Sequence, residues 1–202
     1  MDKQMTDNRT RFVELLRSTK RKGIENVVNS LDNLGFFKAP ASTRFHLNYE
    51  GGLMVHSLNV CDIALELREL MLLKKPELKD DLPRDSVIIS ALLHDVCKAD
   101  VYKPTIKKEK NALGVWVPAK GYDIDYTNFP LGHGEKSVFV LMKSGFHLID
   151  DEIAAIRWHM HAWDLPFQSY ELINNLNAAK NKYPLLNLIQ AADGLAAHLM
   201  ER

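Results

Sequence analysis

The stretch Ala91-Leu92-Leu93-His94-Asp95-Val96-Cys97-Lys98 leads from an apolar segment directly into an imidazole beside a carboxylate. Burying an unpaired carboxylate is so unfavourable that such groups are normally paired, protonated or bound to a cation, and an adjacent neutral imidazole suits metal ligation. The first hypothesis is therefore a metal site at His94 and Asp95. The alternative is a helix whose last turn reaches solvent, where Asp95 pairs with Lys98 and His94 bonds to a carbonyl group.

Further histidines and carboxylates flank this pair along the chain. They occur in Glu50-Gly51-Gly52-Leu53-Met54-Val55-His56, Leu131-Gly132-His133-Gly134-Glu135, Ile156-Arg157-Trp158-His159 and Ala191-Ala192-Asp193-Gly194. The resulting order, H…HD…H…H…D from about Phe45 onward, resembles the HD-domain superfamily of metal-dependent phosphohydrolases. Within it, the approach Tyr49-Glu50-Gly51-Gly52-Leu53 is similar to HD proteins related to 3′-to-5′ exoribonucleases and nucleotide phosphohydrolases.

The resemblance implies one or two divalent ions, the second sharing a bridging carboxylate with the first. The first ion would be held by His56, His94, Asp95 and Asp193, and the second by Asp95, His133 and His159. This mixture of imidazole and carboxylate suits Mn²⁺, Fe²⁺, Co²⁺, Ni²⁺ or Zn²⁺ better than Mg²⁺. Two such ions would lower the pKa of a bridging water and clamp the oxygens of a phosphoester.

One position departs from the family pattern. Many HD phosphodiesterases have two consecutive histidines where this chain has His159 and Met160. A thioether does not replace imidazole for a hard or borderline ion, so the second ion is expected to be held more weakly.

Charged residues near the motifs are candidates for catalysis and substrate contact. Asp95 and Lys98 are the candidate catalytic residues, because Lys98 lies one helical turn beyond His94 and could offset charge on phosphoryl oxygens. Its alternative role is a solvated lysine that complements the helix dipole. The candidate substrate-binding residues are Lys98, Glu50, His161 and Arg157, with Arg44 and Lys136 as further candidates. The alternative for each is an ordinary surface charge.

The other histidines are separated from the ligand set by geometry. His159 and His161 would point to nearly opposite faces of a regular helix, so His161 is predicted to lie at the rim of the site. His147 and His198 are interpreted as structural, and His46 remains open.

Composition sets further bounds. The chain has 202 residues, 46% of them hydrophobic, enough for one sizeable core. Its 26 basic and 26 acidic residues give zero formal net charge, so no global field gathers nucleic acid or an anionic membrane. A long polyanion is therefore not the favoured substrate, although a local basic patch could bind a short nucleic acid.

Cysteine usage and hydropathy bear on the compartment. Cys61 and Cys97 are the only cysteines, and neither belongs to a CxxC pair. They indicate a reduced, cytoplasmic chain with no disulfide framework or thiolate zinc site. The polar residues 1–9 and the lack of a long apolar segment argue against export and membrane insertion.

The hydrophobic periodicity predicts an all-α fold, an HD-domain helical bundle with a small β-hairpin insertion. Residues 1–43 are interpreted as a helical extension and connector that forms a flap or a homodimer contact. Residues 44–202 form the HD hydrolase domain, with two or three strands inserted at about 101–129 as a lid. Helices are expected over 12–35 with a break at Gly23, 52–74, the segment that carries His94-Asp95, 134–143, 150–161, 169–178 and 184–200.

These observations favour a metal-dependent hydrolase acting on a small phosphorylated molecule, such as a nucleotide or short oligonucleotide. Two alternatives stay open. The same ligand order resembles HD oxygenases related to myo-inositol oxygenase, in which two irons activate O₂. A metal-dependent nucleotide sensor without catalysis is the other.

Overall fold

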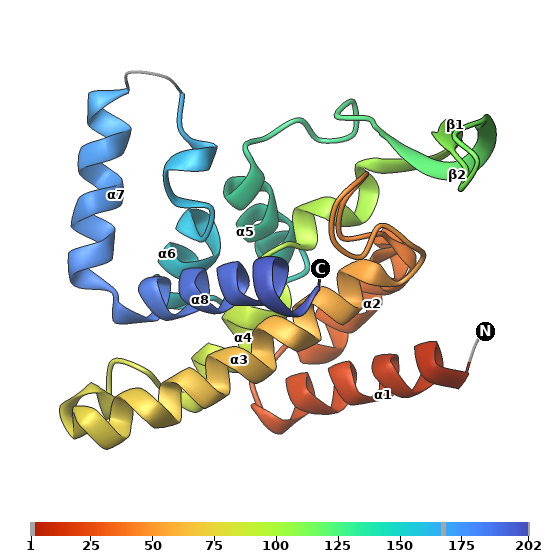
Figure 1. Ribbon diagram of the computed structural model, residues 1–202. Helices are drawn as coiled ribbons and strands as arrows, with labels where there is room; N and C mark the ends of the chain where they lie inside the picture. Colours follow the sequence, from red (N-terminus) through yellow and green to blue (C-terminus); the bar gives the residue numbers. More distant parts are fainter. Residues whose placement is uncertain (1–2, 167–168, 202) are drawn as a thin grey trace.

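The computed structural model describes residues 3–166 and 169–201, and in these ranges helices surround one apolar core while a single hairpin projects from it (Figure 1). The helices are α1 (Lys3–Ser18), α2 (Ile24–Leu34), α3 (Gly52–Lys74), α4 (Arg84–Leu93), α5 (His133–Lys143), α6 (Asp150–Trp158), α7 (Tyr170–Lys182) and α8 (Pro184–Leu195). Short 3-10 segments are η1 (Phe36–Lys38), η2 (Pro76–Lys79), η3 (Val96–Asp100) and η4 (His161–Asp164), and a π-helical turn, η5 (Ala196–Met200), continues α8. The predicted all-α class with a hairpin insertion is confirmed.

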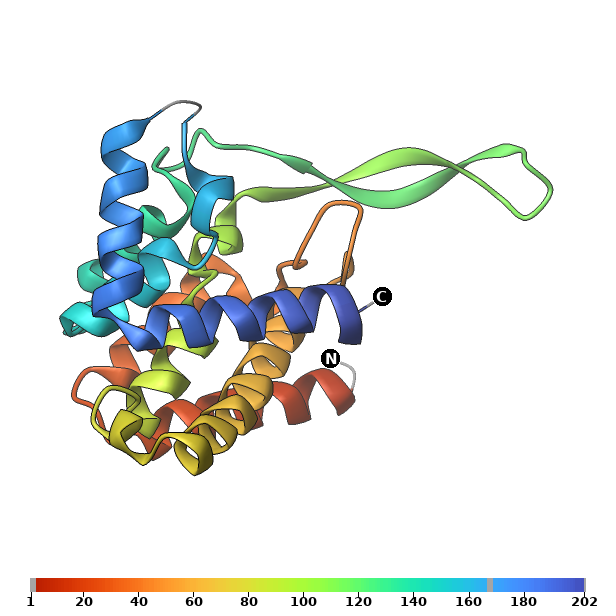
Figure 2. The ribbon, with the colours of Figure 1, turned by 60° about the vertical axis from the view of Figure 1, so that its left-hand side comes forward.

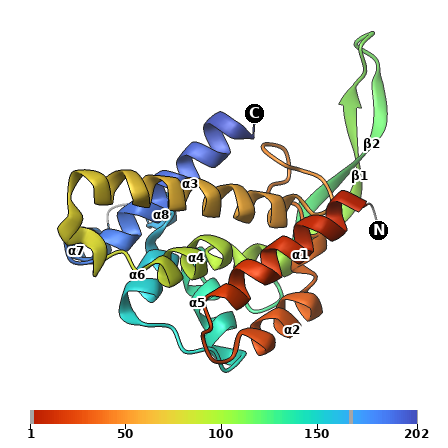
Figure 3. The same ribbon diagram turned by 90° about the horizontal axis from the view of Figure 1, so that it is seen from below.

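The two N-terminal helices belong to the same core as the rest. Phe12 and Leu16 of α1 and Leu31 of α2 are fully buried, and α1 packs on α3 and α4, as Figure 3 shows from below. Gly23 and Gly35, both in the left-handed region, bound α2 at its two ends. The apolar face of this segment therefore packs inside the domain. A flap or homodimer contact formed by its other residues stays a prediction.

The central helix is α4, whose residues from Ser86 to Leu93 are all buried. A buried carboxylate ties it to its neighbours: Glu152, at the start of α6, accepts hydrogen bonds from Arg21 Nη1 at 2.6 Å and Ser86 Oγ at 2.8 Å. Glu152 also accepts the backbone N–H of Ile149 at 3.1 Å, one of the otherwise unpaired amides at the helix start. This network holds α6 against α4.

Helices α5 and α6 approach each other at a glycine. A Cβ on Gly134 would lie 2.1 Å from the carbonyl oxygen of Arg157, so only glycine permits this approach. Gly134 follows His133, and Arg157 precedes His159 by two residues. The contact thereby brings His133 and His159 together, with their ring centroids 5.2 Å apart.

The insertion is one antiparallel pair, β1 (Tyr102–Lys110) with β2 (Trp116–Ile124). No third strand occurs in residues 3–166 and 169–201. Figure 2 shows that the hairpin extends away from the helices and does not fold over them, so it does not form a closed lid in this structure.

Two predicted helices end earlier than expected. Helix α4 ends at Leu93, so Asp95 lies outside it with φ −104° and ψ 19°. Helix α6 ends at Trp158, and His161 has a positive φ of 48°. His159 and His161 therefore do not lie on one regular helix, so helical geometry does not place them on opposite faces. Among the described residues, no helix has the length and apolar character needed to cross a membrane.

We expect Gly134→Ala to lower the free energy of unfolding by about 1–3 kcal/mol, the usual cost of overpacking a rigid contact. The matched control is Gly194→Ala in α8, where an added Cβ meets nothing within 4 Å. That change should be neutral or stabilise by up to about 1 kcal/mol through reduced backbone entropy. Urea titrations of both variants measure the difference, and equal midpoints would contradict the assigned close approach.

Candidate metal centre

Five helices bring the six predicted ligands together. His56 lies in α3, His133 begins α5 and Asp193 lies in α8, whereas His94, Asp95 and His159 immediately follow the ends of α4 and α6. His56, His94, Asp95 and His159 are each at most 2% exposed, and His133 and Asp193 are partly exposed. The site is therefore mostly buried, and His133 and Asp193 are its accessible members.

The Asp95 carboxylate divides the histidines into two pairs. Its Oδ2 lies 3.6 Å from Nε2 of His56 and 3.3 Å from Nε2 of His94. Its Oδ1 lies 2.6 Å from Nε2 of His133 and 3.4 Å from Nε2 of His159. Asp193 Oδ1 joins the first pair, at 3.2 Å from His56 and 4.0 Å from His94. The sequence resemblance implies the same two sets of side chains as ligands, and their ligation stays a prediction. His94 also lies close to His159 and Asp193, so the two sets are in contact.

Local backbone contacts prepare two of the imidazoles for ligation. Nδ1 of His94 donates to the carbonyl of Ala91, and Nδ1 of His159 donates to the carbonyl of Ile156, both at 2.8 Å. Each bond satisfies a carbonyl in the last turn of a helix, where intrahelical partners run out. A proton held on Nδ1 leaves the Nε2 lone pair free for a metal ion.

These Nε2 atoms are the strongest indication of a cation-binding site. Nε2 of His56, His94 and His159 is buried, and none has a hydrogen-bond partner within residues 3–166 and 169–201. An unsatisfied buried polar group is costly and calls for a reason. Ligand atoms that share an ion at about 2.1 Å lie about 3.0–3.5 Å from one another, close to the spacings found here. The donor set therefore fits divalent transition metals.

Glu201 is a member of this cluster that the sequence analysis missed. Its carboxylate accepts from Nδ1 of His56 at 3.0 Å and from Nδ2 of Asn59 at 2.9 Å. The bond orients the His56 ring and makes it a better ligand, as carboxylates commonly do behind metal-bound histidines. The one available signal was spacing, since Glu201 follows Asp193 by eight residues, close to two helical turns.

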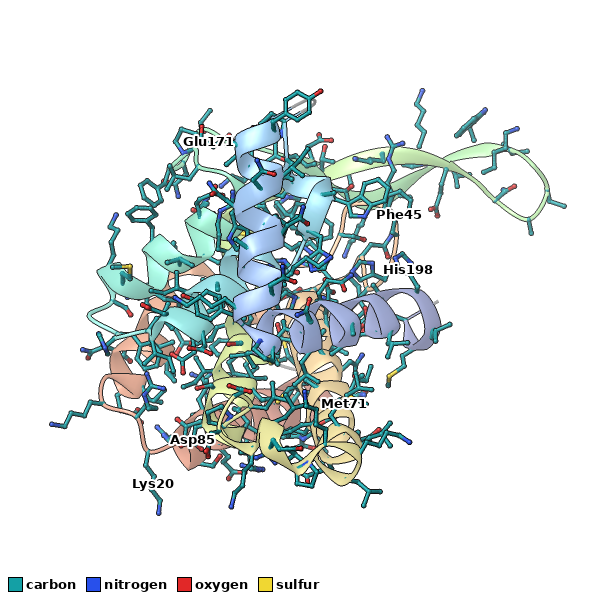
Figure 4. The ribbon with its side chains drawn as sticks, turned by 90° about the vertical axis from the view of Figure 1, so that its left-hand side faces the viewer. Lys20, Phe45, Met71, Asp85, Glu171 and His198 are labelled. Carbon is teal, nitrogen blue, oxygen red and sulfur yellow. The ribbon has the colours of Figure 1, made fainter. Side chains whose placement is uncertain are left out.

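His46, left open by the sequence, lies on the same side. Its ring centroid is 5.0 Å from that of His56, and its Nε2 is 3.9 Å from Glu201. Phe45 and His198, labelled in Figure 4, line a cavity together with His46 and Glu201. His198 is exposed there, whereas His147 lies far from the centre, where its carbonyl accepts from Arg21.

The charged groups at the centre hold one another ionised. Burial disfavours the Asp95 carboxylate, but Lys98 and His94 hold its pKa well below the ordinary value. Burial likewise disfavours the ammonium of Lys98, but Asp95, 2.6 Å away, raises its pKa. Burial lowers the pKa of His56, yet the nearby carboxylates of Asp193 and Glu201 outweigh this effect and raise the pKa to about 9. The pairing of Asp95 with Lys98 thus coexists with the imidazole cluster.

Two cavities border the centre, and Lys98 lines both. One, of about 190 Å³, is lined on the hairpin side by His133, Tyr102 and Phe129. The other, of about 260 Å³, is lined on the α8 side by His159 and Asp193. A phosphoester at the centre would have room for an organic group on either side.

The remaining substrate candidates lie at varied distances from the centre. Glu50 is exposed and borders a separate cavity beside α1. Arg157 forms ion pairs with Glu135 and, at 3.1 Å, with Asp164, so its charge is already neutralised. His161 is half-buried, and burial with the nearby charges of Lys180 and His159 lowers its pKa.

Lys136 and Arg44 differ sharply in their surroundings. Lys136 is 4% exposed, and its Nζ donates to Asp100 at 2.6 Å and to the carbonyl of Asn128 at 2.9 Å. It fixes the loop after the hairpin and does not point into solvent. Arg44 is exposed in the loop before α3.

Both cysteines, Cys61 and Cys97, are buried and free. Cys97 is buried and lies beside the centre. Its sulfur is within 4.8 Å of ligand atoms of Asp95 and His133. Burial lowers the pKa of His133, whereas Cys97 and Asp95 outweigh this and raise it. The hydrophobic context of Cys97 gave no indication of this position.

Comparisons with known proteins agree with the geometry. The sequence profile of the HD domain matches residues 53–198. The dihydroneopterin 2′,3′-cyclic phosphate phosphodiesterase of Methanocaldococcus jannaschii is 31% identical over 140 residues, which cover 68% of this chain and 48% of the relative. The chain thus spans about half the length of that curated relative. No solved structure matches significantly.

We expect His94→Ala and Asp95→Ala each to empty the centre, because His94 supplies an unpaired Nε2 and Asp95 contacts every histidine of the cluster. Elemental analysis after identical purification measures the metal content. His147→Ala, an exposed and remote histidine, is the matched control and should keep wild-type metal. Retention of wild-type metal in both ligand variants would refute the assignment.

Glu201→Gln should weaken metal affinity about 10–100-fold, because it keeps a hydrogen-bond acceptor but removes the charge behind His56. Competition with a chromophoric chelator measures the affinity. Glu171→Gln, in the first turn of α7 and labelled in Figure 4, provides a control with the same chemical change on the surface. An unchanged affinity in Glu201→Gln would show that this carboxylate does not support the ligand.

Proposed function

This chain belongs to the HD-domain family, and on that premise we propose that it is a metal-dependent phosphohydrolase acting on a small phosphorylated molecule. The observation that carries the proposal is the Asp95 carboxylate, each of whose oxygens faces its own pair of imidazoles. The relative from Methanocaldococcus jannaschii, named as a cyclic phosphate phosphodiesterase, supports phosphoester chemistry over the shared region.

In this proposal the first ion is held by His56, His94, Asp95 and Asp193, and a second, weaker ion by Asp95, His133 and His159. The mixed imidazole and carboxylate donors favour Mn²⁺, Fe²⁺, Co²⁺, Ni²⁺ or Zn²⁺. When bound, such ions supply Lewis acidity that makes water a stronger nucleophile and neutralises charge on a phosphoester.

The residues of the chain orient the reactants and stabilise charge. The backbone bonds of His94 and His159 fix both rings before any ligand arrives. The Lys98 ammonium, held 2.6 Å from Asp95 and lining both cavities, is placed to attract a phosphoryl oxygen as negative charge develops.

The substrate contacts follow from these positions. We assign contact with the substrate to Lys98 and His161. Arg157 acts as a positioning residue, because its ion pair with Asp164 anchors η4, which carries His161. Glu50 remains a candidate for contacts outside the centre. Buried, free cysteines suit a reducing compartment, and a cytoplasmic location forms part of this proposal.

Hydrolysis in H₂¹⁸O tests the chemistry. With a 2′,3′-cyclic nucleotide as the probe, we expect one labelled oxygen in the phosphate group of the product, because water supplies the nucleophile. Mass spectrometry of the product measures the label, and Asp95→Ala is the inactive control.

Two results would support the alternatives that the sequence left open. Incorporation of ¹⁸O from ¹⁸O₂ into a carbon product would assign the chain to the oxygenases. Tight binding of nucleotides without turnover by the metal-loaded protein would favour a sensor.

A further inference from the structure

The two faces of the hairpin differ in composition. In the antiparallel register Lys110 lies opposite Trp116, Ile106 opposite Lys120, and Tyr102 opposite Ile124. Directly opposed residues share a face, and side chains alternate along each strand. One face, which we call the Lys-Trp face, therefore carries Tyr102, Lys108, Lys110, Trp116, Lys120 and Tyr122 among its residues.

The Lys-Trp face is basic, aromatic and uncovered. Its three lysines are exposed, and no strand residue on this face is acidic. Trp116 is 62% exposed and Ile106 70% exposed, with Lys110 Nζ 5.4 Å from the Trp116 ring centroid. Exposed large apolar residues on a projecting element indicate a binding surface.

The opposite face is electrostatically balanced. It carries Lys103 and Lys107 together with Glu109 and Asp123, and Lys107 lies 3.2 Å from Asp123. The excess of five lysines over two acidic residues in the two strands is therefore concentrated on one side.

The Lys-Trp face leads to the metal centre. Tyr102, the first residue of β1, lines the same cavity as Lys98 and His133. Nine residues of extended strand span about 30 Å from this point outward. Burial and the negative charge of Glu50 raise the pKa of Tyr122, near the base of the hairpin. The lysines Lys108 and Lys110 lie at the outer end of the face, which is therefore its positive part.

We infer that the Lys-Trp face binds single-stranded nucleic acid and directs it toward the metal centre, an inference that deepens the proposed phosphohydrolase function. Lysines attract the phosphates, and exposed aromatic rings stack on bases, which is the combination that single-strand binding uses. The Lys-Trp face is a local basic patch, although the chain as a whole has zero formal net charge.

Charge also argues against the other occupants. A second copy of the chain that paired through the same face would bring its three lysines against three lysines, which is unfavourable in a symmetric contact. A membrane surface would match the lysines and Trp116. It would not explain why the face ends at the cavity beside the proposed phosphoester site.

Fluorescence anisotropy with a labelled oligothymidylate of about 12 nucleotides tests the inference. The linkages are phosphorothioates, which slow hydrolysis, and the protein is metal-loaded. Lys108→Ala/Lys110→Ala should weaken binding on the order of tenfold and reduce the slope of log K against log salt by about 1.4, the value for two lost phosphate contacts with a single strand. Trp116→Ala should weaken binding by roughly fivefold and leave the salt slope unchanged.

The matched control is Lys103→Ala/Lys107→Ala, which removes the same charge from the same hairpin but from the balanced face. It should change affinity by less than about twofold, because Lys107 is already paired with Asp123. All variants should hydrolyse a small phosphoester at the wild-type rate. Circular dichroism and light scattering report whether each variant remains folded and in which oligomeric state.

Several outcomes would overturn the inference: no oligonucleotide binding by the wild type at low salt, equal losses in the two double variants, or a change only in oligomeric state or vesicle binding. If oligonucleotide binding follows the expected pattern while no phosphoester is hydrolysed, the proposed function fails and the binding face stands. If small phosphoesters are hydrolysed but the Lys-Trp face does not bind the oligonucleotide, the proposed function stands and the binding inference fails.

Discussion

The buried Asp95 carboxylate is the constraint on which the rest of the site depends. A charge in the core requires partners from several directions, and it receives four imidazoles and one ammonium from different elements. This requirement explains why α4, the most completely buried helix, ends one residue before His94 and does not continue. If α4 continued through Asp95, the helical rotation would turn the Asp95 side chain away from its present position between the histidines.

Local structure and chemistry are coupled through the same atoms. The helix ends at His94 and His159 are closed by Nδ1 atoms bonded to carbonyls three residues earlier, and those bonds choose the tautomer that exposes Nε2. His56, in the second turn of α3, follows carbonyls that are already bonded within the helix, and Glu201 orients its ring instead. The imidazole rings are therefore oriented in two ways, by a backbone carbonyl at a helix end and by a carboxylate within a helix.

The framework around the centre is rigid, whereas the surfaces toward substrate are open. Glu152 ties α6 to α4, and Gly134 allows α5 to contact α6, so the distances among the histidines are set by close packing. On the other side, Lys98 lines two cavities, and Tyr102, the first residue of the hairpin, lines one of them. Such a division suits a fixed reaction centre that accepts different organic groups.

The sequence by itself determined the helical class, the hairpin, the bounds of α3 and the six candidate ligands, because apolar periodicity and the HD motif order are local patterns. Tertiary structure decided what those patterns leave open. Glu201 and Cys97 reach the centre, while Glu50 does not, since contacts between residues far apart in the chain leave no periodic trace. The helix ends at Leu93 and Trp158 were also beyond prediction, because they depend on side chains closing the last turn inside a buried cluster.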